Sequence, residues 1–282
     1  MGEGITLSPF ARKQKLLYGR NMCAHREFQY GGYCQECGSL HALPVQPAMT
    51  AATSLMAELE DNSLPAPFAT ETLFGKARGK MFGVMLTQNI SGEQQIIKAF
   101  SGQLNGEWLI PGWVPPLFDV NHFNGINTPE EKRVKALSKQ INNTDCKDEQ
   151  LALKIARRAR CRILMKNLHR LYILHNFRGE QRPMASFFHA KKGMPTGAGD
   201  CCAPKLIQHA LQHELLPIGM AEFYFGRENR SKTKQHGHFY SSCASGCAPI
   251  LGFMLCGLEE LRADSSRQAW AGPSQLLDKP IN

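Results

Sequence analysis

The sequence predicts an α/β protein, and three observations support this fold class. Segments with strand-like patterns alternate along the chain with segments that have helical periodicity. The chain has 282 residues and is 43% hydrophobic, which is enough to bury a substantial core. Its apolar runs are all shorter than the eighteen residues that a membrane-spanning helix needs, so the sequence predicts a soluble protein.

The first half of the chain contains the signals for one helix and two strands. Residues 49–60 have a short helical pattern, and residues 62–67 have the composition of a linker. Residues 80–87 and 95–100 are predicted to be strands, and the connection between them contains Gly92. These two strands are therefore expected to form a hairpin.

The second half begins with two predicted helices. The motif Thr-Pro-Glu-Glu at Thr128 places Thr as N-cap, Pro in the first turn and Glu three residues after the cap. This helix is expected to end near Asn143, and a longer helix is expected over residues 148–175. The apolar run over residues 216–225, which ends in Phe-Tyr-Phe, predicts a buried strand.

Charge and cysteine content narrow the setting in which the protein works. Thirty-three Lys and Arg residues exceed 24 Asp and Glu residues, and the formal net charge of +9 indicates a polyanionic partner such as RNA. The first 18 residues are too polar and basic for a secretory signal. Ten cysteines without such a signal favour free thiols or metal ligands in a reducing, cytoplasmic compartment.

The N-terminal cysteines form a pattern that could bind zinc. Cys34 and Cys37 have the Cys-x2-Cys spacing of half a zinc knuckle, and Cys23 or His25 could complete a set of four ligands. His41 follows closely. The full spacing fits no standard zinc finger, so a loop with ordinary reduced cysteines is the alternative.

Five cations recur at a strict spacing of four within the predicted long helix. They are Lys154, Arg158, Arg162, Lys166 and Arg170. Each step of four residues advances by about 40° around the helix axis, so they form one broad basic face. Because a phosphate backbone would offset the repulsion between these neighbours, we expect the face to contact RNA. The alternative is a solvated face, with Ile155, Ala159 and Ile163 packed inward.

Three cysteines flank the strand predicted over residues 216–225. Cys201 precedes one apolar-periodic stretch, and Cys243 and Cys247 precede another, so all three are expected at or just before helix N-termini. This order resembles the zinc site of cytidine deaminases, in which a His or Cys from one helix and a Cys pair from the next hold the metal. The resemblance implies bound zinc and a deaminase-like three-layer domain.

Two features leave this site open to other interpretations. The Cys pair has one more intervening residue than the usual Cys-x2-Cys, although Gly246 could absorb the added length in a turn. Water, His236 or His238 could supply a fourth ligand, and Cys202 could replace one of the thiols. The alternative is that the cysteines are small buried apolar side chains.

The deaminase layout lacks its proton carrier at the usual position. Cytidine deaminases have a Glu two residues after the first ligand, and this position is Ala203 here. Asp200 and Glu222 are the nearby carboxylates in the sequence, and neither has the usual offset. The sequence therefore predicts a deaminase scaffold without a proton shuttle.

Five segments carry a second resemblance, and they span residues 79–86, 99–104, 113–119, 197–206 and 220–226. In this order they are similar to the long N-terminal region of a subset of RluA-type RNA pseudouridine synthases. In that family the region precedes a catalytic domain, for which too few residues follow Leu255. The resemblance implies an RNA context and a partner synthase, and it transfers no catalytic residue.

These features predict a cysteine-rich segment over residues 1–48, an α/β domain over 49–262 and a disordered tail over 263–282. The expected function is that of a non-catalytic RNA-binding or RNA-modification accessory protein. The alternatives are a zinc-dependent hydrolase of the nucleoside or base deaminase type and a metal-stabilised protein-interaction domain. A carboxylate facing the Cys201 region would favour the hydrolase, whereas a flat basic surface would favour RNA binding.

Overall fold

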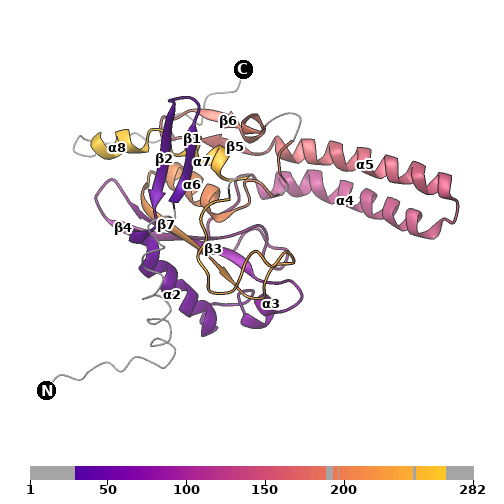
Figure 1. Ribbon diagram of the computed structural model, residues 1–282, viewed down its shortest axis with the longest axis horizontal. Helices are drawn as coiled ribbons and strands as arrows, with labels where there is room; N and C mark the ends of the chain where they lie inside the picture. The colour runs from indigo at the N-terminus through magenta and orange to yellow at the C-terminus, as the bar shows by residue number, and fades with distance from the viewer. Residues whose placement is uncertain (1–28, 189–192, 196, 244–245, 265–282) are drawn as a thin grey trace.

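Three small β-sheets and the helices around them form the described part of the chain. This part comprises residues 29–188, 193–195, 197–243 and 246–264 of a computed structural model (Figure 1). The mixed α/β architecture confirms the predicted fold class, and the deaminase-like three-layer arrangement stays a prediction. Within the described ranges, every helix is too short or too polar to span a lipid bilayer.

The largest sheet has three antiparallel strands in the order β4-β3-β7. Strands β3 (Lys80–Gln88), β4 (Gln94–Phe100) and β7 (Leu216–Phe225) confirm the three strands predicted from the sequence. Helices α2 (Met49–Glu60) and α6 (Cys202–Gln212) lie on opposite sides of this sheet (Figure 1). Because both faces of β7 are covered, its sequence is almost continuously apolar.

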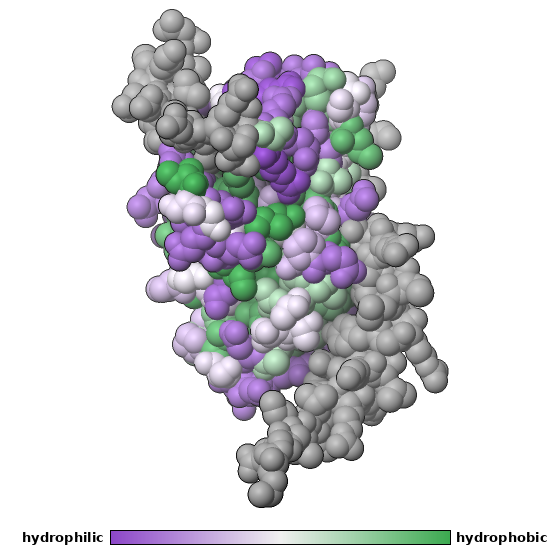
Figure 2. Space-filling view, turned by 90° about the vertical axis from the view of Figure 1, so that its left-hand side faces the viewer, coloured by the Kyte–Doolittle hydropathy of each residue, from purple (hydrophilic) through white to green (hydrophobic). Residues whose placement is uncertain are grey.

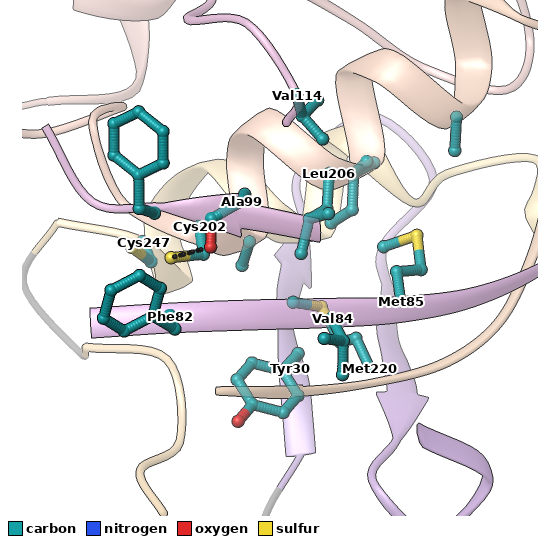
Figure 3. Close-up of a cluster of buried hydrophobic side chains, with 14 of the residues drawn as sticks. Tyr30, Phe82, Val84, Met85, Ala99, Val114, Cys202, Leu206, Met220 and Cys247 are labelled. Atoms are coloured by element: carbon teal, nitrogen blue, oxygen red, sulfur yellow. Dashed lines mark hydrogen bonds between the residues drawn. The ribbon is translucent and has the colours of Figure 1, made fainter. Parts of the chain in front are cut away.

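A glycine lets α6 approach the sheet closely. Gly83 on β3 pairs with Glu222 on β7, so the two residues share the face that α6 covers. A Cβ atom at Gly83 would lie 2.6 Å from the Cβ of Cys202 and 3.3 Å from the Cγ of Glu222. Figure 3 shows Cys202 and Leu206 of α6 over β3, with the Cys202 thiol directed at the carbonyl of Ala99. The start of α6 therefore lies directly over Glu222.

The N-terminal hairpin shares the core of the rest of the protein. Strands β1 (Gln29–Cys34) and β2 (Ser39–Pro44) pair with each other and form a separate two-stranded sheet. Tyr30 and Leu43 of this hairpin are buried in the hydrophobic core that also contains Phe82 of β3. In its described residues, the segment predicted over 1–48 is thus packed against the α/β body.

Two long helices form an arm that extends from this body (Figure 1). Helix α4 (Val120–Asn143) runs antiparallel to α5 (Lys147–His169), and an ion pair between Arg160 and Glu130 joins them, with an N–O distance of 2.9 Å. We call α4 and α5 the helical arm.

On the face of the body turned away from this arm, hydrophilic residues predominate and hydrophobic residues are scattered among them (Figure 2).

The predicted start of α4 and the predicted end of α5 were wrong, whereas the predicted end of α4 near Asn143 was confirmed and the predicted start of α5 was one residue late. Helix α4 begins at Val120 because Asp119 caps it, with Oδ1 accepting a hydrogen bond of 2.6 Å from the backbone of His122. Pro129, predicted in the first turn, lies inside the helix. Helix α5 ends at His169, where the chain turns into strand β5.

The remaining elements are short and connect these parts. They are η2 (Gln46–Ala48), α3 (Thr70–Phe74), β5 (Ile173–His175), β6 (Gln181–Pro183), η3 (Met184–Phe187), α7 (Ala248–Met254) and α8 (Leu258–Asp264). Strands β5 and β6 pair antiparallel. Helix α7 is buried between the N-terminal hairpin and α6, with Cys247 directly before it and Cys256 shortly after it.

Candidate metal centres

Local structure places two of the three predicted cysteines at helix starts, as the sequence indicated, and Cys243 five residues before α7. Cys201 is the N-cap residue of α6, and Cys247 immediately precedes α7. The backbone N–H groups of Cys247 and Ala248 donate to the carbonyl oxygen of Cys243, at 3.1 and 3.0 Å. These bonds hold Cys243 next to the start of α7, which brings the thiols of Cys243 and Cys247 to one place.

The segment before Cys243 is held along the free edge of β7. The N–H of Tyr224 donates to the carbonyl of His238 at 2.9 Å, and the N–H of Tyr240 donates to the carbonyl of Glu222 at 3.0 Å. These bonds give β7 a partner on the edge that β3 leaves open. Three residues after Tyr240, the chain reaches Cys243 beside the start of α6.

The Sγ atoms of Cys201, Cys243 and Cys247 all lie within 4.8 Å of one another. We call these three residues the thiol cluster. Hydrogen bonds from the thiols of Cys201 and Cys247 lower the pKa of Cys243, so the cluster already stabilises one thiolate. Cys243 is exposed, Cys201 is half-buried and Cys247 is buried. This composition and spacing could hold a metal ion that keeps one position open.

A buried carboxylate lies next to the thiol cluster. Oε1 of Glu222 accepts a hydrogen bond of 2.6 Å from the backbone N–H of Ala203, two residues after Cys201. The Glu222 residue is only 5% exposed. Burial raises its pKa to about 7, and the hydrogen bond from Ala203 opposes this increase. A carboxylate from strand β7 therefore lies beside Ala203, where the sequence has no carboxylate of its own.

Tyr30 fixes the backbone on which Glu222 is carried. The hydroxyl of Tyr30 accepts a hydrogen bond of 2.7 Å from the N–H of Glu222 and donates one of 2.6 Å to the carbonyl of Tyr240. Burial of Tyr30 and the nearby Glu222 raise the pKa of the tyrosine, which therefore stays neutral. The hairpin residue Tyr30 joins β7 to the segment leading to Cys243, a role that no sequence pattern indicated.

Lys234 brings a positive charge close to this group. Its Nζ lies 3.6 Å from the ring centroid of Tyr240, a cation–π contact. Burial lowers the pKa of Lys234, while the negative charges of Glu222 and then of the thiol cluster oppose this effect. The side chain therefore balances part of the negative charge that thiolates and a carboxylate bring together.

Other residues considered from the sequence lie apart from the thiol cluster. Asp200 accepts a hydrogen bond of 2.8 Å from the hydroxyl of Tyr172. The Cys202 thiol is directed into the sheet, at 3.4 Å from the carbonyl of Met81. His236 accepts a hydrogen bond of 3.2 Å from the N–H of Gly226 through Nδ1. Among the described residues, the metal-ligand group at this place contains the three cysteines and no histidine.

Among the described residues, the N-terminal cysteines Cys34 and Cys37 lie beside His41 and Cys256. The ligand atoms of Cys34, Cys37, His41 and Cys256 all lie within 4.8 Å of one another. We call these four residues the hairpin cluster. The predicted partners Cys23 and His25 lie outside the described residues. The sequence showed His41 as a near neighbour, but Cys256 is separated from the hairpin by most of the chain and carries no local signal.

All five predicted cations are exposed; four of them lie on α5, and Arg170 is the C-cap residue directly after it. Lys154, Arg158, Arg162, Lys166 and Arg170 project from the helical arm, and none forms an ion pair with another described residue. The alternative interpretation placed Ile155, Ala159 and Ile163 on an inward-packed side of this helix, and this packing is not found, since Ile155 is 58% and Ile163 is 62% exposed. Contact of this face with RNA stays a prediction.

Comparison of the chain with protein-family models, with curated proteins and with solved structures found no match. The protein is therefore classified by its fold and its candidate sites. This is a mixed α/β protein with two Cys or Cys/His groups that could coordinate metal ions.

Proposed function

We propose that the protein is a zinc-dependent hydrolase of the nucleoside or base deaminase type, with Glu222 as its proton carrier. The observation that carries this proposal is the hydrogen bond between Glu222 and the backbone of Ala203, beside the thiol cluster. Zinc sites of this class use His/Cys/Cys or three Cys ligands with a separate Glu for proton transfer. The chain supplies the three thiols and the carboxylate, although the carboxylate comes from β7.

The chemistry would be hydrolytic removal of an amino group from a nucleobase. Water supplies the oxygen of the new carbonyl group, the bond from the ring carbon to the amino nitrogen breaks, and ammonia leaves. Glu222 would accept a proton from the water and deliver it to the departing amino group. A zinc ion held by three thiolates would leave one position open for water and make that water more acidic.

The environment of Glu222 supports this role. A carboxyl group with a pKa near 7 can both accept and donate a proton at neutral pH. Its position is fixed by the N–H of Ala203 at the side chain and by the hydroxyl of Tyr30 at the backbone. A proton carrier held at both ends would keep the same position between the two proton transfers.

The test compares wild-type protein with Glu222→Gln for ammonia release from cytidine, adenosine and single-stranded oligonucleotides. The amide oxygen of Gln can still accept the hydrogen bond from Ala203, so the fold and the zinc content should stay unchanged. Activity should fall by about 10²-fold or more, because general acid–base catalysis typically contributes that much. Glu228→Gln, at an exposed residue in the loop after β7, is the matched control and should keep full activity.

Zinc content makes a negative result decisive. Cys243→Ser should lose both the metal of the thiol cluster and the activity. If zinc-loaded wild-type protein releases no more ammonia than Glu222→Gln from any of these substrates, the hydrolase proposal is refuted.

A second candidate function is RNA binding by the helical arm, as in a non-catalytic RNA-modification accessory protein. The observation that favours it is the exposure of the five cations on and directly after α5. A row of unpaired cations at helical spacing can follow a phosphate backbone. This function needs no chemistry at the thiol cluster, and it could also deliver RNA to that site.

A further inference from the structure

The hairpin cluster combines residues from the two ends of the described chain. Cys34 is the last residue of β1, Cys37 lies in the turn that follows, and His41 is on β2. Cys256 follows α7 by two residues. The distance between Sγ of Cys37 and Nε2 of His41 is 3.0 Å. A local Cys-x2-Cys turn is thus completed by one ligand from the hairpin and one from a distant helix end.

We propose that Cys34, Cys37, His41 and Cys256 bind one zinc ion in a structural site of the Cys₃His type. Three thiolates and one imidazole are a closed tetrahedral ligand set for zinc, which leaves no position for water or substrate. Cys34 and Cys256 are buried and the other two ligands are half-buried, as expected for a metal that stabilises a fold. This site goes beyond the proposed hydrolase and does not depend on it.

The backbone around the hairpin cluster is shaped for close contact. The turn after Cys34 is closed by a hydrogen bond of 3.0 Å from the N–H of Gly38 to the carbonyl of Cys34, and Gly38 has a φ of +70°. A Cβ at Gly252 of α7 would lie 2.5 Å from the carbonyl oxygen of Tyr33. The hairpin and α7 therefore touch through their backbones, which brings Cys256 to the tip of the hairpin.

The same helix connects the two clusters. Cys247 immediately precedes α7 and belongs to the thiol cluster, whereas Cys256 follows α7 and belongs to the hairpin cluster. Strand β1 also connects the two clusters. It contains Cys34 of the hairpin cluster and Tyr30, whose hydroxyl accepts a hydrogen bond from the backbone N–H of Glu222. Metal at the hairpin cluster would thus hold the two elements that position the candidate active centre.

The main experiment counts zinc in the full chain by native mass spectrometry and by elemental analysis. Wild-type protein should carry two zinc ions per chain. Cys37→Ser and Cys243→Ser should each carry one, and the double variant should carry none. Cys146→Ser, at an exposed cysteine between the two arm helices, is the matched control and should keep both ions. One zinc in wild type, lost in Cys243→Ser and kept in Cys37→Ser, would overturn the proposal.

A second pair of variants identifies the nitrogen ligand and covers the case in which Cys37→Ser does not fold. His41→Cys keeps four zinc ligands and should retain two ions, whereas His41→Ala should lose one. Equal zinc content in both variants would contradict a role for His41.

Thiol labelling of wild-type protein gives the same information without any substitution. Cys37 should react with a maleimide only after zinc is removed by a chelator, whereas exposed Cys146 should react at once. Reaction of both at the same rate in zinc-loaded protein would contradict the site. Since none of these readouts measures ammonia release, failure of this proposal and failure of the hydrolase proposal are distinguishable.

Discussion

At the scale of single residues, the surroundings decide what an ionisable group can do. Glu222 has an ordinary side chain in an apolar strand, yet burial raises its pKa to about 7, against the opposing hydrogen bond from Ala203. Asp200, one residue before Cys201, has a different environment and bonds to Tyr172. Sequence distance from the thiols would have ranked the two carboxylates in the opposite order.

His209 on α6 predicts a pH dependence of stability. Burial, followed by repulsion from His213, lowers its pKa to about 4, and its Nδ1 is buried without a hydrogen-bond partner among the described residues. The unfolded chain takes up this proton near pH 6.5 and the folded chain only near pH 4. Stability is therefore expected to fall as the pH is lowered through this window.

The expected loss is about 1 kcal/mol after allowance for solvent screening of a partly exposed ring. Thermal melts of wild type and His209→Gln between pH 7 and pH 4 measure it. The variant should show a smaller decrease in Tm, and His122→Gln, at an exposed histidine in α4, should behave like wild type. Equal decreases in all three proteins would show that His209 does not contribute.

Gly83 provides a second prediction at this scale. In Gly83→Ala the added Cβ would meet Cys202 at 2.6 Å, so we expect a loss of about 1–3 kcal/mol, as for overpacked cores. Gly125 in α4 has open space around its Cβ position, and Gly125→Ala should stabilise the protein by about 0.5–1 kcal/mol. Denaturant unfolding measures both, and a Gly83→Ala protein as stable as wild type would contradict the close approach of α6 to β3.

At the scale of elements, α5 differs from the helices of the body. Buried helices such as α6 are apolar on most faces, whereas α5 has a buried side only at residues such as Leu164 and Leu168 near the body. Ile155 and Ile163 of α5 are exposed, and Ile163 lines a pocket that also includes residues of α4. The helical arm therefore offers both charge and apolar surface to a ligand or partner.

RNA binding by α5 should show a salt dependence that reports the number of phosphate contacts. For single-stranded RNA, log K should fall with log salt by roughly 0.7 for each phosphate neutralised. The double variant Arg158→Gln with Arg162→Gln nearly preserves helix propensity and should weaken binding across sequences. Its slope should become shallower by roughly 1 to 2 units if each side chain contacts one phosphate.

A charge-matched control separates a specific contact from net charge. Arg227→Gln with Arg230→Gln removes two exposed cations from the loop after β7 and should leave the slope nearly unchanged. Equal slopes for wild type and the α5 variant would mean that the five cations are a solvated face.

At the scale of the whole molecule, the two ends of the described chain close on each other. The N-terminal hairpin packs on α7, and the core that they share also contains β3 and α6. Tyr30 and Cys34 are four residues apart, yet one contacts the backbone of Glu222 and the other belongs to the hairpin cluster. The candidate active centre is therefore supported by the N-terminal hairpin, whose Tyr30 lies 192 residues before Glu222 in the sequence.

The sequence by itself determined most of the local structure. Apolar runs predicted β3, β4 and β7, because strand and helix periodicities are set by backbone geometry within a few residues. The cysteines at the starts of α6 and α7 were predicted for the same reason. The clearest local failure was α4, where the motif at Thr128 lies inside a helix that Asp119 had already capped.

Only the tertiary structure decided which distant residues meet. The register of β7 against β3 and the short distance allowed by Gly83 place Glu222 under the start of α6, beside Ala203. Packing of α7 on the hairpin brings Cys256 to Cys34, although most of the chain separates these two residues. Neither contact has a local signature, because each depends on the mutual orientation of elements that are far apart along the chain.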